Sequence, residues 1–173
     1  AIEQLTSSQH FNYAQQRLLV STVGIPDGML QLAQQFPRIN LALSLHSVSQ
    51  QTRDKIIPVS HKYSLQELKQ VLQTLNQLQQ RPVMIEYLTL AGINDSPSDA
   101  NALIAWLDGL QVHLNLIPFN TIKESPHLSC STPEAQQQFA NQLRAAGVTV
   151  TRRYSLGDDI AAACGQLAQK TSG

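Results

Sequence analysis

Short apolar runs alternate with helical patterns along the whole chain, and this alternation is the strongest constraint on the fold. The runs are almost continuously apolar, as expected of parallel strands that are covered on both faces. They comprise residues 17–22, 39–46, 82–90, 112–119 and 147–153. Because parallel neighbours must be joined by a crossover, which is usually a helix, the pattern predicts an α/β fold with parallel strands alternating with helices.

The segments between the runs contain recognisable helix starts. Ser64 and Glu67 fit a capping box, and Ser96 and Thr132 each precede a proline, which is favoured at the first helical position. A last helix is predicted from about Asp158. Five strands are too few for a closed eight-stranded barrel, so the pattern leaves open a doubly wound sheet or part of a (β/α) barrel.

The composition indicates one globular domain covering residues 1–173. Of these residues 42% are hydrophobic and 14% are charged, with a formal net charge of zero, which gives no electrostatic footprint for nucleic acid or an anionic membrane. No apolar run approaches the ~18 residues of a membrane span, and residues 1–11 lack the features of a signal peptide. A cytoplasmic location is therefore expected. A helical pattern is already running at Ala1, so we expect the native protein to extend upstream.

Polar side chains stand at or after the ends of three predicted strands. They are Ser21 at the end of the first strand, Ser44 and His46 at the end of the second, and Asn120 at the end of the fourth. Ligands of parallel α/β folds bind at the carboxyl ends of the strands, and hydroxyl, imidazole and amide groups suit a polar small molecule. The alternative is that these residues are polar only because strand ends meet water and begin turns.

Three further residues carry chemistry that the pattern alone leaves open. Glu86 lies in an otherwise apolar strand, where its carboxylate must be hydrogen-bonded, paired or protonated; it is either a site residue or half of an ion pair with an arginine. Cys164 lies on the apolar stripe of an alanine-rich helix, where a cysteine is more often a small buried hydrophobic residue than a nucleophile. Cys130 lies in a loop, and no cysteine or histidine spacing predicts a metal site.

Five motifs in order resemble the C-terminal half of the radical S-adenosylmethionine adenine-C2 RNA methyltransferases, the RlmN/Cfr type. Residues 20–26 read Val-Ser-Thr-Val-Gly-Ile-Pro, residues 41–46 read Leu-Ala-Leu-Ser-Leu-His, and Ile-Glu-Tyr at 85–87 precedes Ile-Asn-Asp at 93–95. Asn-Leu-Ile-Pro-Phe-Asn follows at 115–120, and Ala-Cys-Gly-Gln-Leu at 163–167 is the most specific element. The resemblance implies part of a partial (β/α) barrel, S-adenosylmethionine and a 4Fe–4S cluster as cofactors, and methylation of an adenine in 23S rRNA and, for some members, tRNA.

The resemblance also implies roles for individual residues. The positions that match those holding S-adenosylmethionine are Ser21, Ser44, Leu45, His46 and Asn120. Cys164 matches the cysteine that is first methylated and then delivers its carbon to the base. A thiolate suits the first of these steps because sulfur is a strong nucleophile.

Several parts of the family pattern do not occur in these 173 residues. They are the Cys-x-x-x-Cys-x-x-Cys cluster motif, the Gly-Met-Gly-Glu-Pro segment, the second catalytic cysteine and the N-terminal accessory domain. We therefore expect a C-terminal portion that is inactive on its own. The alternatives are a natural short paralogue that binds RNA or a nucleoside without catalysis, and a small-molecule domain with Cys164 as nucleophile. The open barrel edge further predicts that the isolated chain self-associates.

Overall fold

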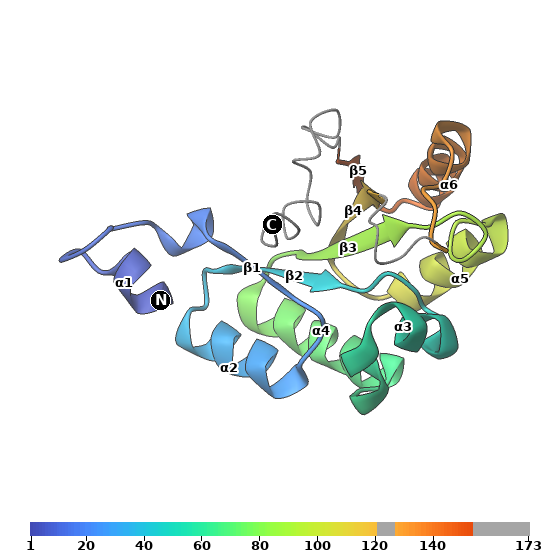
Figure 1. The fold of residues 1–173 in the computed structure, drawn as a ribbon. Helices are drawn as coiled ribbons and strands as arrows, with labels where there is room; N and C mark the ends of the chain where they lie inside the picture. Colours follow the sequence, from blue (N-terminus) through green and yellow to red (C-terminus); the bar gives the residue numbers. More distant parts are fainter. Residues whose placement is uncertain (121–126, 154–173) are drawn as a thin grey trace, which may run out of the picture.

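Five parallel strands form one sheet in which each strand pairs with the next along the chain (Figure 1). The computed structural model describes residues 1–120 and 127–153. The strands are β1 (Leu19–Thr22), β2 (Asn40–Ser44), β3 (Val83–Thr89), β4 (Val112–Pro118) and β5 (Val150–Arg152). Each predicted apolar run contains one of them, and the strands begin later or end earlier than the runs because the flanking residues form turns.

The strand order distinguishes between the two architectures that the sequence left open. A doubly wound sheet reverses its strand order at a switch point. The order β1-β2-β3-β4-β5 has no such reversal, and all four pairings are parallel. The α/β prediction is confirmed, and the arrangement is that of part of a (β/α) barrel.

Helices precede the first strand and occupy the connections between the strands. They are α1 (Ile2–Thr6), α2 (Pro26–Gln35), α3 (Gln50–Ile56), α4 (Leu65–Gln79), α5 (Pro97–Leu107) and α6 (Pro133–Ala145), with short 3₁₀ turns at Gln15–Arg17 and Pro58–Lys62. The predicted caps at Ser64, Ser96 and Thr132 are confirmed, each accepting a backbone N–H from the first turn. The sequence analysis did not predict α2 and α3, and the helix predicted from Asp158 lies outside the described residues.

Removing the cap of α4 is expected to destabilise the fold measurably. Ser64 and Glu67 exchange hydrogen bonds in a capping box, so Ser64→Ala should lower the free energy of unfolding by about 1 kcal/mol. Thr74→Ala is the matched control, since the Thr74 hydroxyl bonds only to the carbonyl of Gln70 in the preceding turn. Urea unfolding of both variants provides the measurement, and an equal loss in the two would contradict a special role of the cap.

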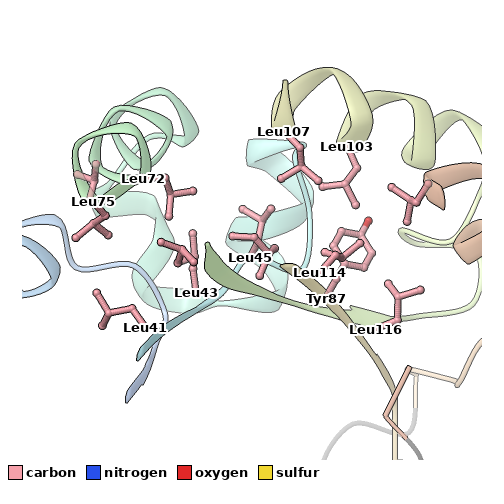
Figure 2. Close-up of a cluster of buried hydrophobic side chains, with 14 of the residues drawn as sticks. Leu41, Leu43, Leu45, Leu72, Leu75, Tyr87, Leu103, Leu107, Leu114 and Leu116 are labelled. Carbon is pink, nitrogen blue, oxygen red and sulfur yellow. The ribbon is translucent and has the colours of Figure 1, made fainter. Parts of the chain in front are cut away.

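The hydrophobic core lies between one face of the sheet and the helices α2, α4, α5 and α6. Residues of β3 alternate between buried and half-buried, because successive side chains of a strand point to opposite faces. Figure 2 shows leucines of α4 and α5 over leucines of β2 and β4: Leu72 and Leu75, Leu103 and Leu107, Leu41 and Leu43, and Leu114. The opposite face of the sheet therefore remains available for polar side chains.

Candidate ligand site on the inner face of the sheet

A row of polar residues crosses the face of the sheet opposite the core helices α2, α4, α5 and α6. Glu86 is one of the half-buried residues of β3, and the strand register places Ser44 of β2 on one side of it and Asn115 of β4 on the other. Thr151 of β5 continues the row, with its hydroxyl 3.3 Å from Asn115 Oδ1. Neighbours in register share a face of the sheet, so these residues form one continuous polar surface.

Glu86 is held by two serine hydroxyls. Its Oε2 accepts hydrogen bonds from Ser21 Oγ at 2.6 Å and from Ser44 Oγ at 3.1 Å. Within the described part of the chain the hydrogen-bond partners of this carboxylate are hydroxyls, so the interpretation as an ion pair with an arginine is wrong. Because each serine donates its one proton to Glu86, its oxygen presents only lone pairs to a ligand.

His46 lies at the turn that follows β2, not in the strand that the sequence predicted. Its φ is 59°, in the left-handed region that is uncommon for residues other than glycine. The ring Nδ1 lies 3.1 Å from the backbone N of Leu88, whose N–H it accepts. Burial lowers the pKa of His46 to about 4, a shift that the Glu86 carboxylate opposes and the Arg53 charge reinforces. The imidazole is therefore neutral near pH 7, and with Nδ1 used as an acceptor its proton resides on Nε2.

Asn94 connects this turn to the segment after β3. Its Nδ2 donates to the carbonyl oxygens of His46 and Leu88, both at 2.7 Å, and its Oδ1 accepts the N–H of Leu90 at 2.8 Å. The Asn94 side chain is fully buried. Asn94 belongs to the Ile-Asn-Asp motif at 93–95, but the sequence did not predict its role. The carbonyl groups that an asparagine binds cannot be inferred from its neighbours in the sequence.

Arg53 connects the turns after β1 and β2 through hydrogen bonds to a carbonyl group of each turn. It projects from α3 and is fully buried, with Nε donating to the carbonyl of Leu45 at 3.1 Å and Nη2 to that of Val23 at 2.6 Å. Sequence reasoning missed this residue because a single arginine in a short helix is usually solvent-exposed. Its burial depends on contacts with two other turns.

The structure brings together three of the five predicted binding residues. Ser21, Ser44 and His46 all lie around Glu86. Leu45 is different: its side chain is fully buried in the core, and its N–H donates to the Glu86 carbonyl at 3.0 Å. A ligand therefore has no access to the Leu45 side chain.

The other predicted residues lie further along the chain. Asn120 is half-buried just beyond the end of β4, while Cys164 lies outside the described residues. Cys130 forms an isolated bridge with Leu90, and its sulfur accepts from Gln136 Nε2 at 3.3 Å. Cys130 therefore lies in a loop before α6, as the sequence indicated.

The free energy of unfolding should depend on pH because the His46 imidazole is buried. An unfolded histidine binds a proton below a pH of about 6.5, and folded His46 binds one only below about 4, so acid favours the unfolded chain between these values. The free energy of unfolding should fall by up to about 3 kcal/mol as the pH drops through this range. Urea unfolding at several pH values measures it, and His46→Gln should flatten the profile whereas His10→Gln should not. A parent chain with the same profile as His46→Gln would contradict the burial.

Neither a metal centre nor a membrane span is evident in the part of the chain that the structure describes. No group of three or more His, Cys, Asp or Glu side chains in residues 1–120 and 127–153 could hold a metal ion. Among the same residues no helix is both long and apolar enough to cross a membrane. With two cysteines in the whole sequence, the residues present do not fit a 4Fe–4S cluster held by three cysteines.

The chain is similar in sequence to RNA methyltransferases. It is 54% identical over 167 residues to a probable RNA methyltransferase of Rhodopirellula baltica, covering 96% of this chain and 44% of the relative. It is 43% identical over 170 residues to the dual-specificity RNA methyltransferase RlmN of Desulfotalea psychrophila, covering 97% and 46%. The chain is a homologue of the RlmN-type radical SAM RNA methyltransferases. It spans about half the length of these curated relatives.

Two solved structures share the fold of this chain. A radical SAM methyltransferase from Sphaerobacter thermophilus superposes with a TM-score of 0.90 at 35% identity, over 95% of this chain and 48% of that one. A domain of a pyruvate-formate lyase-activating enzyme from Bacteroides vulgatus has a TM-score of 0.61 at 18% identity, over 79% and 80%, which shows a shared fold alone. No family model matches the chain.

Proposed function

We propose that this chain is the C-terminal portion of a radical S-adenosylmethionine methyltransferase that modifies C2 of an adenine in 23S rRNA and tRNA in the cytoplasm. The single observation that carries the proposal is the cluster in which Glu86 holds the hydroxyls of Ser21 and Ser44 beside His46. The cluster lies on the inner face of part of a (β/α) barrel, the fold in which ligands bind at the carboxyl ends of the strands. Homology to RlmN-type enzymes supplies the substrate class.

Each polar group has a distinct task in this proposal. The oxygens of Ser21 and Ser44 accept hydrogen bonds from donors of S-adenosylmethionine, and neutral His46 donates through Nε2–H. Asn120 supplies an amide from the end of β4. Leu45 takes part through its position in the turn, since its side chain is buried in the core. Such a neutral set of donors and acceptors fits the nucleoside part of S-adenosylmethionine.

Cys164 is the proposed methyl carrier. As a thiolate it attacks the methyl carbon next to the sulfonium sulfur, a carbon–sulfur bond forms on Cys164, and the electron pair of the broken bond remains on the departing thioether. S-adenosylmethionine supplies this methyl group when it is bound. Transfer of the methyl carbon to the base needs the 4Fe–4S cluster of the family. The residues present do not fit such a cluster, so the chain on its own should not methylate RNA.

Binding of S-adenosylmethionine to the purified chain tests the proposal. Calorimetry should show saturable binding that Ser44→Ala weakens, whereas Ser98→Ala, in the first turn of α5, leaves it unchanged. No binding at millimolar S-adenosylmethionine would overturn the proposed site. Binding of adenosine but not of S-adenosylmethionine would favour a short paralogue that binds a nucleoside without catalysis. Methylation of an RNA transcript by the chain alone would contradict the proposal that the chain is inactive on its own.

We also infer that the isolated chain self-associates through β1. This strand pairs only with β2 among the described residues, and Leu19 on it is 49% exposed, which is typical of an edge that pairs with another chain. Light scattering at high protein concentration should give a mass above 19.1 kDa, and Leu19→Lys should return it to the monomer value. A monomeric parent chain would contradict this inference.

A further inference from the structure

We propose that Arg53 and Asn94 are positioning residues that hold His46 in a strained turn with its Nε2–H directed to an acceptor atom of the bound ligand. The inference rests on the proposed function, since it assigns the way in which the S-adenosylmethionine site is kept in shape. Nothing in the family resemblance stated above gives a role to either residue.

The backbone of His46 adopts a conformation that needs support. The N–H of Ser47 donates to the carbonyl of Leu45 at 2.8 Å, and His46 between them has a φ of 59°. A three-residue turn with positive φ at its centre is the rare and strained form of the γ-turn. Strain of this kind persists only where surrounding contacts fix it, and it concentrates at functional sites.

Arg53 and Asn94 bind the two carbonyl groups that flank this strained residue. Arg53 Nε donates to the carbonyl of Leu45, which precedes His46, at 3.1 Å. Asn94 Nδ2 donates to the carbonyl of His46 itself at 2.7 Å. Both donors are fully buried, so water does not compete for the two carbonyls. The peptide units on either side of the His46 Cα are therefore each held by a side chain from another element.

Asn94 also controls the ring through Leu88. The same Nδ2 that binds the His46 carbonyl donates to the carbonyl of Leu88 at 2.7 Å, and the N–H of Leu88 donates to His46 Nδ1 at 3.1 Å. A ring nitrogen that accepts a backbone N–H carries no proton in the neutral imidazole. One carboxamide thus fixes both the backbone of His46 and the residue that selects its tautomer.

The hydrogen bonds of Arg53 favour a positioning role over an ion pair. Among the described residues its hydrogen bonds go to main-chain carbonyls of the turns after β1 and β2, those of Val23 and Leu45, and its Nη1 is buried without a partner there. The adjacent Asp54 carboxylate instead accepts from Ser60 at 2.5 Å and from Gln50 at 2.8 Å. The guanidinium therefore holds together two of the turns that form the site.

The electrostatics of His46 determine what it offers a ligand. The charged groups near it are Glu86 on β3 and Arg53 on α3, with opposite effects on its charge, and burial keeps the ring neutral. A neutral ring avoids charge repulsion with the sulfonium of S-adenosylmethionine. It still presents one N–H donor, which matches a ring nitrogen or carboxylate oxygen of the ligand and not an ammonium group.

Nitrogen NMR of the imidazole tests the positioning role without any ligand. In the full chain with ¹⁵N-labelled histidine, two-bond ¹H–¹⁵N spectra at pH 7 should show His46 Nδ1 without a proton and Nε2 with one, and His46→Gln assigns the signals. Asn94→Asp keeps the shape and the Oδ1 acceptor but loses both donors, so the spectrum should change to a mixture of tautomers. Arg53→Lys keeps the charge but cannot reach two carbonyls, and it should also shift the His46 signals.

Matched variants and a binding measurement complete the test. Asn101→Ala replaces an exposed asparagine of α5, and Lys55→Ala replaces an exposed lysine of α3; neither should move the His46 signals. Affinity for S-adenosylmethionine should fall about 10-fold in Asn94→Asp and Arg53→Lys, with circular dichroism showing that each variant is folded. If Asn94→Asp does not fold, the result for Arg53→Lys alone tests the positioning role.

The outcomes separate this inference from the proposed function. Unchanged His46 signals in the folded variants, or a parent chain with the proton on Nδ1, overturn the positioning role. The expected tautomer and its loss in the variants, in a chain that does not bind S-adenosylmethionine, support the positioning role and overturn the proposed function.

Discussion

Replacing Glu86 with alanine should weaken the binding of S-adenosylmethionine by about 100-fold. The carboxylate accepts from Ser21 and Ser44 at 2.6 and 3.1 Å, and hydrogen bonds to charged groups are worth about 1.5–3 kcal/mol each. Without Glu86 both hydroxyls are free to rotate and no longer present oriented lone pairs to the ligand. A loss of about 3 kcal/mol corresponds to about two orders of magnitude in Kd. Calorimetric titration of the purified variant measures it.

Two variants control for unrelated effects of the Glu86 substitution. Glu86→Gln keeps one acceptor oxygen in the same shape and should therefore lose less affinity than Glu86→Ala. Glu134→Ala removes an exposed carboxylate at the start of α6 and should bind as the parent does. If Glu86→Ala also kept the parent affinity, Glu86 would not orient the serines for a ligand, and the cluster would be no more than a structural feature of the sheet.

Phe139→Ala should produce the largest loss of stability, about 3–5 kcal/mol in the free energy of unfolding. Phe139 of α6 is 2% exposed, and its ring stacks on that of Tyr87 in β3 with centroids 5.4 Å apart. Truncation to alanine leaves a cavity between α6 and the sheet that neighbouring side chains fill only in part. Urea unfolding followed by circular dichroism gives the free energy directly.

Phe139→Leu is the control for this variant, because it retains most of the apolar volume and should cost much less than the alanine substitution. A loss below about 1 kcal/mol in Phe139→Ala would be at odds with a close-packed contact between α6 and β3.

Local sequence rules predicted much of the fold but not all of its helices. Apolar runs marked all five strands, and serine or threonine caps marked α4, α5 and α6, because each signal is contained in a few adjacent residues. The helix α2 contains Gly28 in its first turn, which weakens a helical pattern. The helix α3 is only seven residues long, too short for a clear apolar stripe. Pro26 at the start of α2 and the cap at Ser49 were signals that could have indicated both.

The site was predictable where it depends on strand ends and not where it depends on distant contacts. Ser21 and Ser44 were identified because polar residues at the ends of parallel strands share an edge. The alternation of polar His113 and Asn115 with apolar residues in β4 was also a readable sign of an inner polar face. The turn at His46 could not be predicted from the sequence, because side chains from α3 and from the segment after β3 hold it in place.

The consecutive strand order has a consequence for how the chain is made. A ribosome delivers the N-terminal end of a chain first, and here each new strand pairs with the strand completed immediately before it. The sheet can therefore grow by one strand and one helix at a time during synthesis. Each new strand covers the edge that the previous strand left open, whereas the outer edge of β1 stays unpaired among the described residues.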